Sequence, residues 1–185
     1  MVNRPVPIAE AVVAAADPLL MFNTDTYVNE KTANLNGLEF NVQHMFGKSG
    51  FGVLANYTYV HSPLKYNNNN LDVSTQFAIV GLSDSANLVG IYEDNNWSVR
   101  VAYNWRDKFL ASTTQPGGTN GPVYTDAYGQ VDASINYALN KNLSFQFDVV
   151  NLTNAIQKQV GRTDLEVESV TQTGARYLLG ARYKF

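Results

Sequence analysis

The residues that could do acid–base or metal chemistry are few in this chain, and they are scattered. The sequence has 2 histidines, His44 and His61, and no cysteine. Neither histidine has an acid or a nucleophile at a fixed spacing beside it, so no catalytic set is visible and we do not expect an enzyme. The lack of cysteine excludes disulfides, thiolate metal sites and cysteine nucleophiles.

Two polar stretches are candidates for ligand binding in loops: Tyr-Asn-Asn-Asn-Asn at 66–70 and Gln-Pro-Gly-Gly at 115–118. Asp72 and Asp84 could add oxygen ligands for Ca²⁺, but the spacing of an EF-hand is absent. The glycines at 117 and 118 lack the strand, helix and lysine of a phosphate-binding loop. We expect solvated loops here, with neither a metal nor a cofactor.

Six further charged residues occupy alternate positions of strand-like segments, where they could line a polar path for a solute. They are Arg100, Arg106, Asp132, Asp148, Arg176 and Arg182. The alternative is a cross-strand polar network that stabilises the wall of a barrel. We favour the wall, because nothing in the spacing selects a ligand.

The segments that carry these charges alternate between apolar and polar residues. In residues 97–106, the odd positions hold Trp, Val, Val, Tyr and Trp, and the even positions hold Ser, Arg, Ala, Asn and Arg. Residues 130–139, 143–150 and 176–185 repeat this pattern. Because side chains alternate across a strand, each segment has one apolar face and one polar face. Every charge in these four segments falls on the polar face.

The same alternation, weaker near the N-terminus, predicts seven strands. They span residues 31–46, 51–61, 79–93, 97–108, 127–139, 142–153 and 172–185. The turns expected to be short are 47–50, 94–96 and 140–142, and the loops expected to be long and polar are 61–84, 107–127 and 152–172. Short periplasmic turns and long extracellular loops are typical of outer-membrane barrels.

Strand length and ring placement also favour a membrane barrel over a soluble sandwich. The strands run about ten residues, which suits a tilted strand that crosses a bilayer. Trp97 and Trp105 share a face eight residues apart, as do Tyr177 and Phe185. That separation is roughly 26 Å along a strand, so rings at both ends suit the two aromatic girdles of the membrane interfaces.

Composition excludes several other classes of protein. The chain has 185 residues, of which only 16% are charged and 12% are aromatic, whereas about 25% charged residues is usual for a soluble domain. The net charge of -3 lacks the basic footprint of a nucleic-acid binder. No run approaches the roughly 18 apolar residues of a spanning helix.

Several stretches together resemble the C-terminal third of the barrel of a TonB-dependent outer-membrane receptor. They are LNGLEF at 35–40, ANYTYVHS at 55–62, and the longer stretches 85–110, 128–154 and 177–185. The most specific signals are NLTN at 151–154 and the aromatic C-terminus. Gly180, Tyr183 and Phe185 match the signal read by the barrel-assembly machinery, although Leu178 stands where that signal prefers a polar residue.

This resemblance implies a bacterial outer-membrane location, contact with outer-membrane lipid, and a 22-stranded barrel occluded by a plug domain. Such receptors import scarce ligands such as siderophores, cobalamin or saccharides, powered by the TonB complex. The chain has no room for a plug, so it would contact TonB only through that missing domain. The resemblance does not identify the small-molecule ligand, and no nucleic-acid partner is expected.

We therefore expect an all-β, antiparallel transmembrane barrel segment that is incomplete. Residues 1–30 are expected to form an extracellular loop or N-terminal extension, and residues 31–185 the C-terminal part of the barrel. Bacterial barrels have an even number of strands, so seven strands that begin outside indicate part of a larger barrel. Two alternatives stay open. Residues 19–29 could supply an eighth strand and close a complete small barrel with a structural or adhesive role, or the chain could be a soluble β-sandwich binding module.

Overall fold

The computed structural model of the chain describes residues 32–72, 76–116 and 120–185. The chain divides after Thr32, and the fold described below is that of the unit Ala33–Phe185. The possible eighth strand at 19–29 lies outside the described residues. Within the described ranges, no helix is long and apolar enough to cross a membrane.

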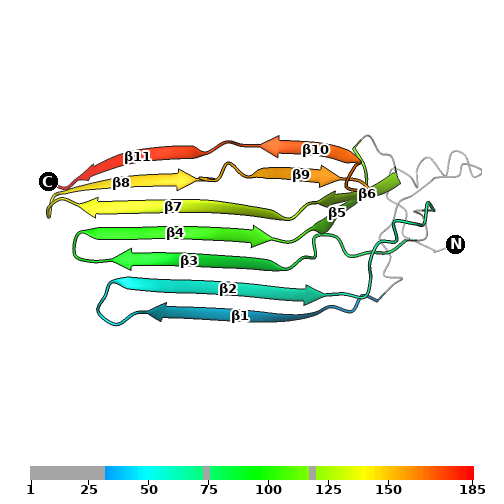
Figure 1. The fold of residues 1–185 in the computed structure, drawn as a ribbon, viewed down its shortest axis with the longest axis horizontal. Helices are drawn as coiled ribbons and strands as arrows, with labels where there is room; N and C mark the ends of the chain where they lie inside the picture. Colours follow the sequence, from blue (N-terminus) through cyan, green and yellow to red (C-terminus); the bar gives the residue numbers. More distant parts are fainter. Residues whose placement is uncertain (1–31, 73–75, 117–119) are drawn as a thin grey trace, which may run out of the picture. The chain divides into compact units, whose positions relative to one another are not determined.

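Seven antiparallel strands form one sheet in the order β1-β2-β3-β4-β7-β8-β11 (Figure 1). Their bounds are β1 Asn36–Met45, β2 Phe51–His61, β3 Ser85–Glu93, β4 Trp97–Arg106, β7 Tyr128–Ala138, β8 Leu143–Val150 and β11 Arg176–Tyr183. The seven predicted strands and the three short turns are thus confirmed. The expected start of β3 at residue 79 is wrong, because Gly81 adopts a left-handed φ of 76° that ends extended pairing before Ser85.

The register aligns the apolar face of every strand with that of its neighbours. Val101 of β4 is paired with Gly90 on one side and Ala133 on the other. Trp97 is paired with Tyr137, and their ring centroids are 4.4 Å apart. Because directly opposed residues project from the same face, the apolar side chains form one continuous surface. Many of them are solvent-exposed, including Leu38 at 60%.

A second sheet of four strands lies where long loops were expected. Its order is β10-β9-β6-β5, with bounds β5 Phe109–Thr114, β6 Asn120–Thr125, β9 Ile156–Val160 and β10 Val167–Gln172. The prediction that 107–127 and 152–172 are loops is therefore wrong. β5 and β9 follow β4 and β8, and β6 and β10 lead into β7 and β11. Pairing with one another satisfies the backbone groups of these four strands.

The smaller sheet also carries most of the buried side chains in the described part of the chain. Val160 has 0% exposure, Val123 4% and Leu110 7%, and Pro122 is fully buried as well. β6 meets β9 only through Tyr124 and Thr125. The connection between β2 and β3 contains no strand in its described residues.

Asn151 forms the corner between the two sheets and gives the NLTN stretch a physical role. It follows β8, adopts a left-handed φ of 59°, and is only 1% exposed. Its Oδ1 accepts from the backbone N–H of Ala155 at 2.8 Å, and its Nδ2 donates to Thr173 Oγ1 at 3.3 Å. One asparagine thus joins the end of β8 to the approach of β9 and of β11, and asparagine tolerates this φ better than most residues.

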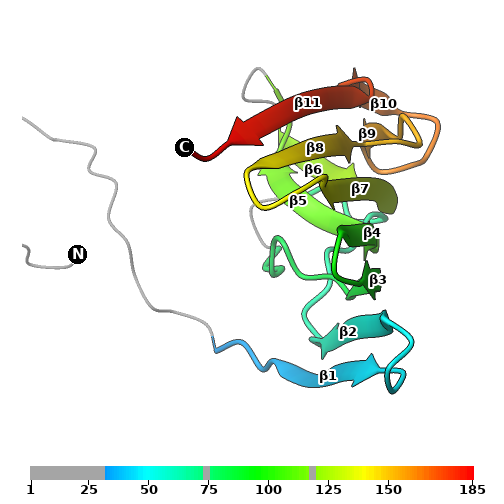
Figure 2. The same cartoon turned by 90° about the vertical axis from the view of Figure 1, so that its left-hand side faces the viewer.

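The large sheet is open. Figure 2 shows its strands following an arc, with β1 at one end and β11 at the other. Neither edge is paired, and β1 is exposed along its whole length. Because each neighbouring pair is antiparallel and the number of strands is 7, β1 and β11 both run toward the end that carries the short turns.

Substitutions at two adjacent positions of β4 should distinguish the two faces. Val101→Arg places a charge in the middle of the apolar face and should destabilise the sheet by about 2–4 kcal/mol in a bilayer. Ala102→Arg is the matched control, because Ala102 opposes Asp132 on the polar face. Urea unfolding of the chain in phospholipid vesicles, followed by tryptophan fluorescence, measures both. Equal costs at the two positions would contradict a lipid-facing surface.

Candidate functional site

The six charged candidate residues all lie on the polar face of the large sheet. Asp148 is paired with Ser134, and Ser134 is paired with Arg100. The same ladders carry this face to the remaining four candidates on β4, β7 and β11, which are Arg106, Asp132, Arg176 and Arg182. The register therefore gathers on one face residues that are spread over 83 positions of the sequence, from 100 to 182.

Asp132 is the centre of a hydrogen-bond network across the strands. Its Oδ1 accepts from Gln130 Nε2 at 2.6 Å and from the backbone N–H of Asn151 at 2.9 Å. Its Oδ2 accepts from Asn104 Nδ2 at 3.3 Å. Tyr128 extends the network by donating to Gln130 Oε1 at 2.8 Å. This arrangement is that of a cross-strand brace, which favours a role for Asp132 in the wall.

Asp148 and Arg106 are also engaged by the protein itself. Asp148 Oδ2 accepts from Gln146 Nε2 at 2.6 Å. Arg106 Nε donates to Ser83 Oγ at 2.8 Å, and its guanidinium carbon lies 3.8 Å from the centroid of the Phe109 ring. Arg106 thus fastens the connection 62–84 to the start of β5.

The remaining arginines, Arg100, Arg176 and Arg182, have no carboxylate partner in the described part of the chain. Arg176 borders a groove over β7, β8 and β11 that also includes Asp132, Asp148 and Leu178. These three arginines are exposed on the polar face.

Replacing Asp132 tests the brace. Asp132→Ala leaves the buried backbone N–H of Asn151 without its acceptor and should cost about 1–3 kcal/mol of folding free energy. Asp148→Ala is the control, since it releases only the exposed amide of Gln146, and it should stay within about 0.5 kcal/mol. The urea midpoints of the two variants in vesicles measure both costs. An unchanged midpoint for Asp132→Ala would refute the brace.

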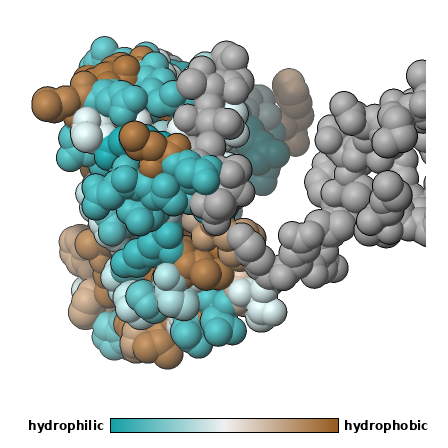
Figure 3. All heavy atoms as spheres, turned by 90° about the vertical axis from the view of Figure 1, so that its right-hand side faces the viewer, coloured by the Kyte–Doolittle hydropathy of each residue, from teal (hydrophilic) through white to brown (hydrophobic). Residues whose placement is uncertain are grey.

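The crown, as we name residues 61–84, 107–126 and 156–172 where described, lines much of an open cavity at the end of the sheet away from the short turns. The cavity volume is about 490 Å³. It is lined by the described residues Tyr59, Tyr66, Asn68, Phe109, Tyr124 and Arg162, among others. Figure 3 shows this end of the unit, where hydrophilic residues cover much of the visible surface between apolar patches.

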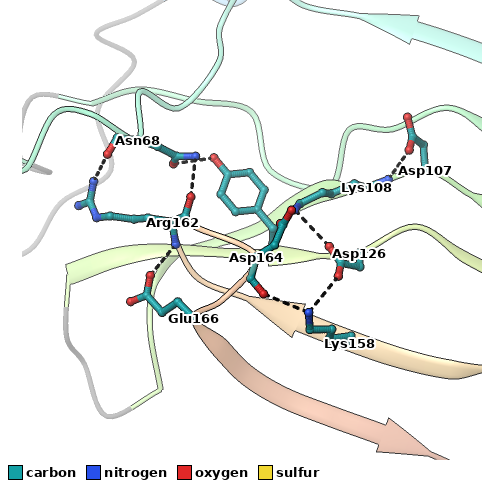
Figure 4. Close-up of polar contacts among 9 residues, drawn as sticks. Asn68, Asp107, Lys108, Asp126, Lys158, Arg162, Asp164 and Glu166 are labelled. Carbon is teal, nitrogen blue, oxygen red and sulfur yellow. Dashed lines mark hydrogen bonds and ion pairs between the residues drawn. The ribbon is translucent and has the colours of Figure 1, made fainter.

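Ion pairs connect the two hairpins of the crown (Figure 4). Lys108 Nζ lies 3.1 Å from Asp126 Oδ1 and also contacts Asp164 Oδ1. Lys158 Nζ lies 3.9 Å from Asp126 Oδ2 and donates to the backbone carbonyl of Asp164 at 3.1 Å. Two lysines and two aspartates thus link β5–β6 to the turn that follows β9.

The ion pairs shift the pKa values of their members. The hydrogen bond and the charge of Lys108 hold the pKa of Asp164 below its usual value. Burial alone would lower the pKa of Lys108, but hydrogen bonds to Asp164 and Asp126 outweigh it and raise that pKa. Burial raises the pKa of the Tyr124 phenol. Both Lys108 and Asp164 therefore stay charged over the neutral range.

The two pKa shifts predict that acid weakens the ion pairs of the crown. A depressed Asp164 pKa stabilises the contact above the ordinary pKa of aspartate, and the stabilisation is lost as the pH falls through the lowered value. The raised Lys108 pKa preserves it until the pH rises through that raised value. The chain has 0 cysteines, so spin labels at Thr113→Cys and Leu165→Cys report the distance between the hairpins. We expect one narrow distance at pH 7 and a broad distribution once the pH falls below the lowered pKa of Asp164.

Two lysine variants complete this experiment. Lys108→Met should give the broad distribution at pH 7 as well, because it removes both ion pairs. Lys141→Met is the matched control, since Lys141 lies exposed in the short turn between β7 and β8. A distribution that is independent of pH and of Lys108 would show that the ion pairs do not position the hairpins.

The aromatic candidates lie on the apolar face of the sheet. Trp97 and Trp105 occupy opposite ends of β4, and Tyr177 lies at the crown end of β11. Phe185 follows β11, with its ring centroid 5.2 Å from that of Tyr183. Within the predicted assembly signal, Gly180 is paired with Gln146. These placements suit the predicted girdles and signal.

The remaining sequence candidates stay apart from each other. His44 lies on β1 with its ring 4.9 Å from that of Phe46, and His61 ends β2. Asp84 accepts from Tyr57 Oη at 2.9 Å and from the backbone N–H of Val60. In residues 32–72, 76–116 and 120–185, no group of three or more His, Cys, Asp or Glu side chains could hold a metal ion.

The crown cavity is the feature that sequence analysis missed. Tyr66, Tyr124 and Arg162 come from three segments with no common spacing, and each reads alone as a solvated loop residue. The run of asparagines at 67–70 was the only local indication of a site. It did not predict that Asn68 contacts Arg162, which lies 94 residues away in the sequence.

A comparison with protein families agrees with the sheet geometry. The family described as TonB dependent receptor-like, beta-barrel matches residues 7–152. The chain belongs to this family. TonB-dependent receptor barrels are receptors and transporters of the bacterial outer membrane rather than enzymes. No curated protein and no solved structure matches the chain. The match ends two residues after β8, so β9, β10 and β11 lie outside it.

Proposed function

We propose that this chain forms the C-terminal part of the barrel of a TonB-dependent receptor. The supporting observation is the odd, open sheet of 7 strands, whose two unpaired edges run in the same direction. Closure with antiparallel pairing needs a further odd number of strands, about fifteen for a 22-stranded transporter barrel. Direct pairing of β1 with β11, or with β11 of a second copy, would be parallel.

The complete receptor would take up a scarce solute, such as a siderophore, cobalamin or a saccharide, with energy from the TonB complex. This chain would contribute wall and crown, and the plug would supply the contact with TonB. Arg100, Arg176 and Arg182 are proposed to face the solute path, while Arg106, Asp132 and Asp148 stabilise the wall. Residues 1–30 are proposed to be extracellular and to lead into β1.

Membrane insertion is proposed to depend on both ends of the strands. Trp97, Trp105, Tyr177 and Phe185 would lie at the lipid interfaces, where aromatic rings are favoured. Gly180, Tyr183 and Phe185 would be read by the barrel-assembly machinery. Leu178 is exposed on the polar face opposite Asp148, so its departure from the signal leaves the apolar face unchanged.

A chimera tests whether the sheet completes a larger barrel. Residues 33–185 replace the last seven strands of a cobalamin receptor, and the product is expressed in the outer membrane. Closed barrels migrate faster on gels before heating than after it. We expect heat-dependent migration for the chimera and none for the chain expressed alone with the same leader.

Uptake of labelled cobalamin then tests transport. The chimera should support uptake in cells with TonB and lose it in cells without TonB. A chimera that carries Val101→Arg should be less stable in the membrane and support less uptake, so it serves as the negative control. Heat-dependent migration of the chain by itself would instead establish a complete small barrel and overturn the proposal.

A further inference from the structure

We propose that the free edge of β1 binds an antiparallel strand that presents a side-chain amide directly opposite Asn41, as the donor of a hydrogen bond. The inference rests on the proposed function and deepens it, because it states the register and the side-chain chemistry of the strand next to β1. It comes from a row of amide side chains that crosses the polar face of the large sheet.

The amide row, as we name it, has one member on each of the neighbouring strands β1, β2, β3, β4 and β7. Successive members are direct partners in the ladders, and they are Asn41, Asn56, Asn87, Asn104 and Gln130. The next level of the same face toward the short turns begins with Gln43, but its partners on β2 and β3 are Leu54 and Val89. Alternation places polar residues on one face, yet it does not set them at one level. The row is therefore a separate feature of the sheet.

Hydrogen bonds in the amide row run in one direction. Asn87 Nδ2 donates to Asn104 Oδ1, and Asn104 Nδ2 donates to Asp132 Oδ2 at 3.3 Å. An ionised carboxylate only accepts hydrogen bonds, so Asp132 ends the row at β7. Each bonded amide thus donates toward β7 and keeps its oxygen as an acceptor for the strand on its β1 side. Hydrogen bonds aligned in this way polarise and strengthen one another.

The row is interrupted at Asn56. Its Oδ1 is buried and has no hydrogen-bond partner in the part of the chain that the structure describes, which costs free energy. Because this oxygen is shielded from solvent, only its neighbours in the sheet can donate to it, and its neighbours in the row are Asn41 and Asn87. Asn87 donates away from Asn56, toward Asn104. Asn41 is therefore the donor that Asn56 requires.

Asn41 lies on an edge strand that is exposed along its whole length, and it has a neighbouring strand on only one side. The backbone N–H of Phe46 donates to the carbonyl of Phe51 at 2.8 Å, and hydrogen-bonded pairs alternate along an antiparallel ladder. The backbone groups of Asn41 therefore face away from β2, toward the free edge. A strand on that edge would form two backbone hydrogen bonds with Asn41 and set its own side chain beside Asn41 on the polar face.

An amide on this strand completes the row, whereas a carboxylate or an apolar group does not. When the amide donates to Asn41 Oδ1, it leaves Asn41 Nδ2 on the side of Asn56, where the unpaired oxygen lies. A carboxylate can only accept, and it would also approach Glu39, which is exposed on the same face of β1. An apolar side chain would leave Asn41 without a donor. An amide also offers its own oxygen to the strand beyond it, so the row can continue.

Peptide binding to the full chain tests the edge. The chain is folded in lauryldimethylamine oxide micelles, and its sheet content is checked by circular dichroism. Three fluorescent peptides of alternating Val and Thr carry Gln, Leu or Glu in place of the central Thr, and N-methylation of the Val amides leaves each peptide only one edge that can pair. We expect the Gln peptide to bind about threefold to tenfold more tightly than the other two, as measured by fluorescence anisotropy.

Two variants on the polar face of β1 show whether this preference depends on the amide row. Asn41→Leu should bind the Gln and Leu peptides equally, because the row then ends at Asn56. Gln43→Leu is the matched control, since Gln43 is an amide on the same face and the same strand but is paired with Leu54, outside the row. It should keep the preference for the Gln peptide. Circular dichroism checks the sheet content of both variants.

Four results would overturn the inference: no saturable binding of the Gln peptide, equal binding of the Gln and Leu peptides by the wild type, equally tight binding of the Glu peptide, or loss of the preference in Gln43→Leu as well. A dimer of the chain that excludes the peptide would assign the edge to a second copy and overturn it too. The assay needs neither the chimera nor TonB. Its failure beside a chimera that closes would refute only this inference, and selective binding beside a chimera that stays open would refute only the barrel proposal.

Discussion

The register of the antiparallel ladders is the constraint on which this structure depends. Side chains alternate with a period of two, so a slip of one residue in any ladder would move a whole strand of rings onto the polar face. Pairs such as Trp97 with Tyr137 and Leu38 with Tyr59 preserve the alignment from β4 to β7 and from β1 to β2. The charges collect on the opposite face as a consequence.

The large sheet and the crown are stabilised by different interactions. Within the large sheet, side chains such as Leu179 at 78% exposure have no protein partner to cover them, which is stable in lipid and costly in water. Beyond it, the crown builds its own small core around Val160 and Val123 and joins its hairpins through ion pairs. Asn151 lies where these regions meet, and its amide links strands that belong to both.

Periodicity was sufficient to predict the seven strands, their faces and their short turns, because each depends on local alternation. It failed for the connections 107–127 and 152–172. Strands such as Asn120–Thr125 are short, have no clear alternation, and pair across the two connections, as Tyr124 does with Val160. Similarly, the placement of the six charged residues on one face was predictable, whereas the three-hydrogen-bond environment of Asp132 was not.

The sequence by itself determined the class of the protein: low charge, ring-bearing alternating strands and the NLTN and C-terminal stretches identify an outer-membrane barrel wall. These properties depend on residues that are close together in the sequence, because the geometry of an extended strand alone decides which of its side chains share a face. Only the tertiary structure decided the crown. Its cavity brings Tyr66 and Arg162 together across 96 positions, and such contacts follow from the closure of loops rather than from any period in the chain.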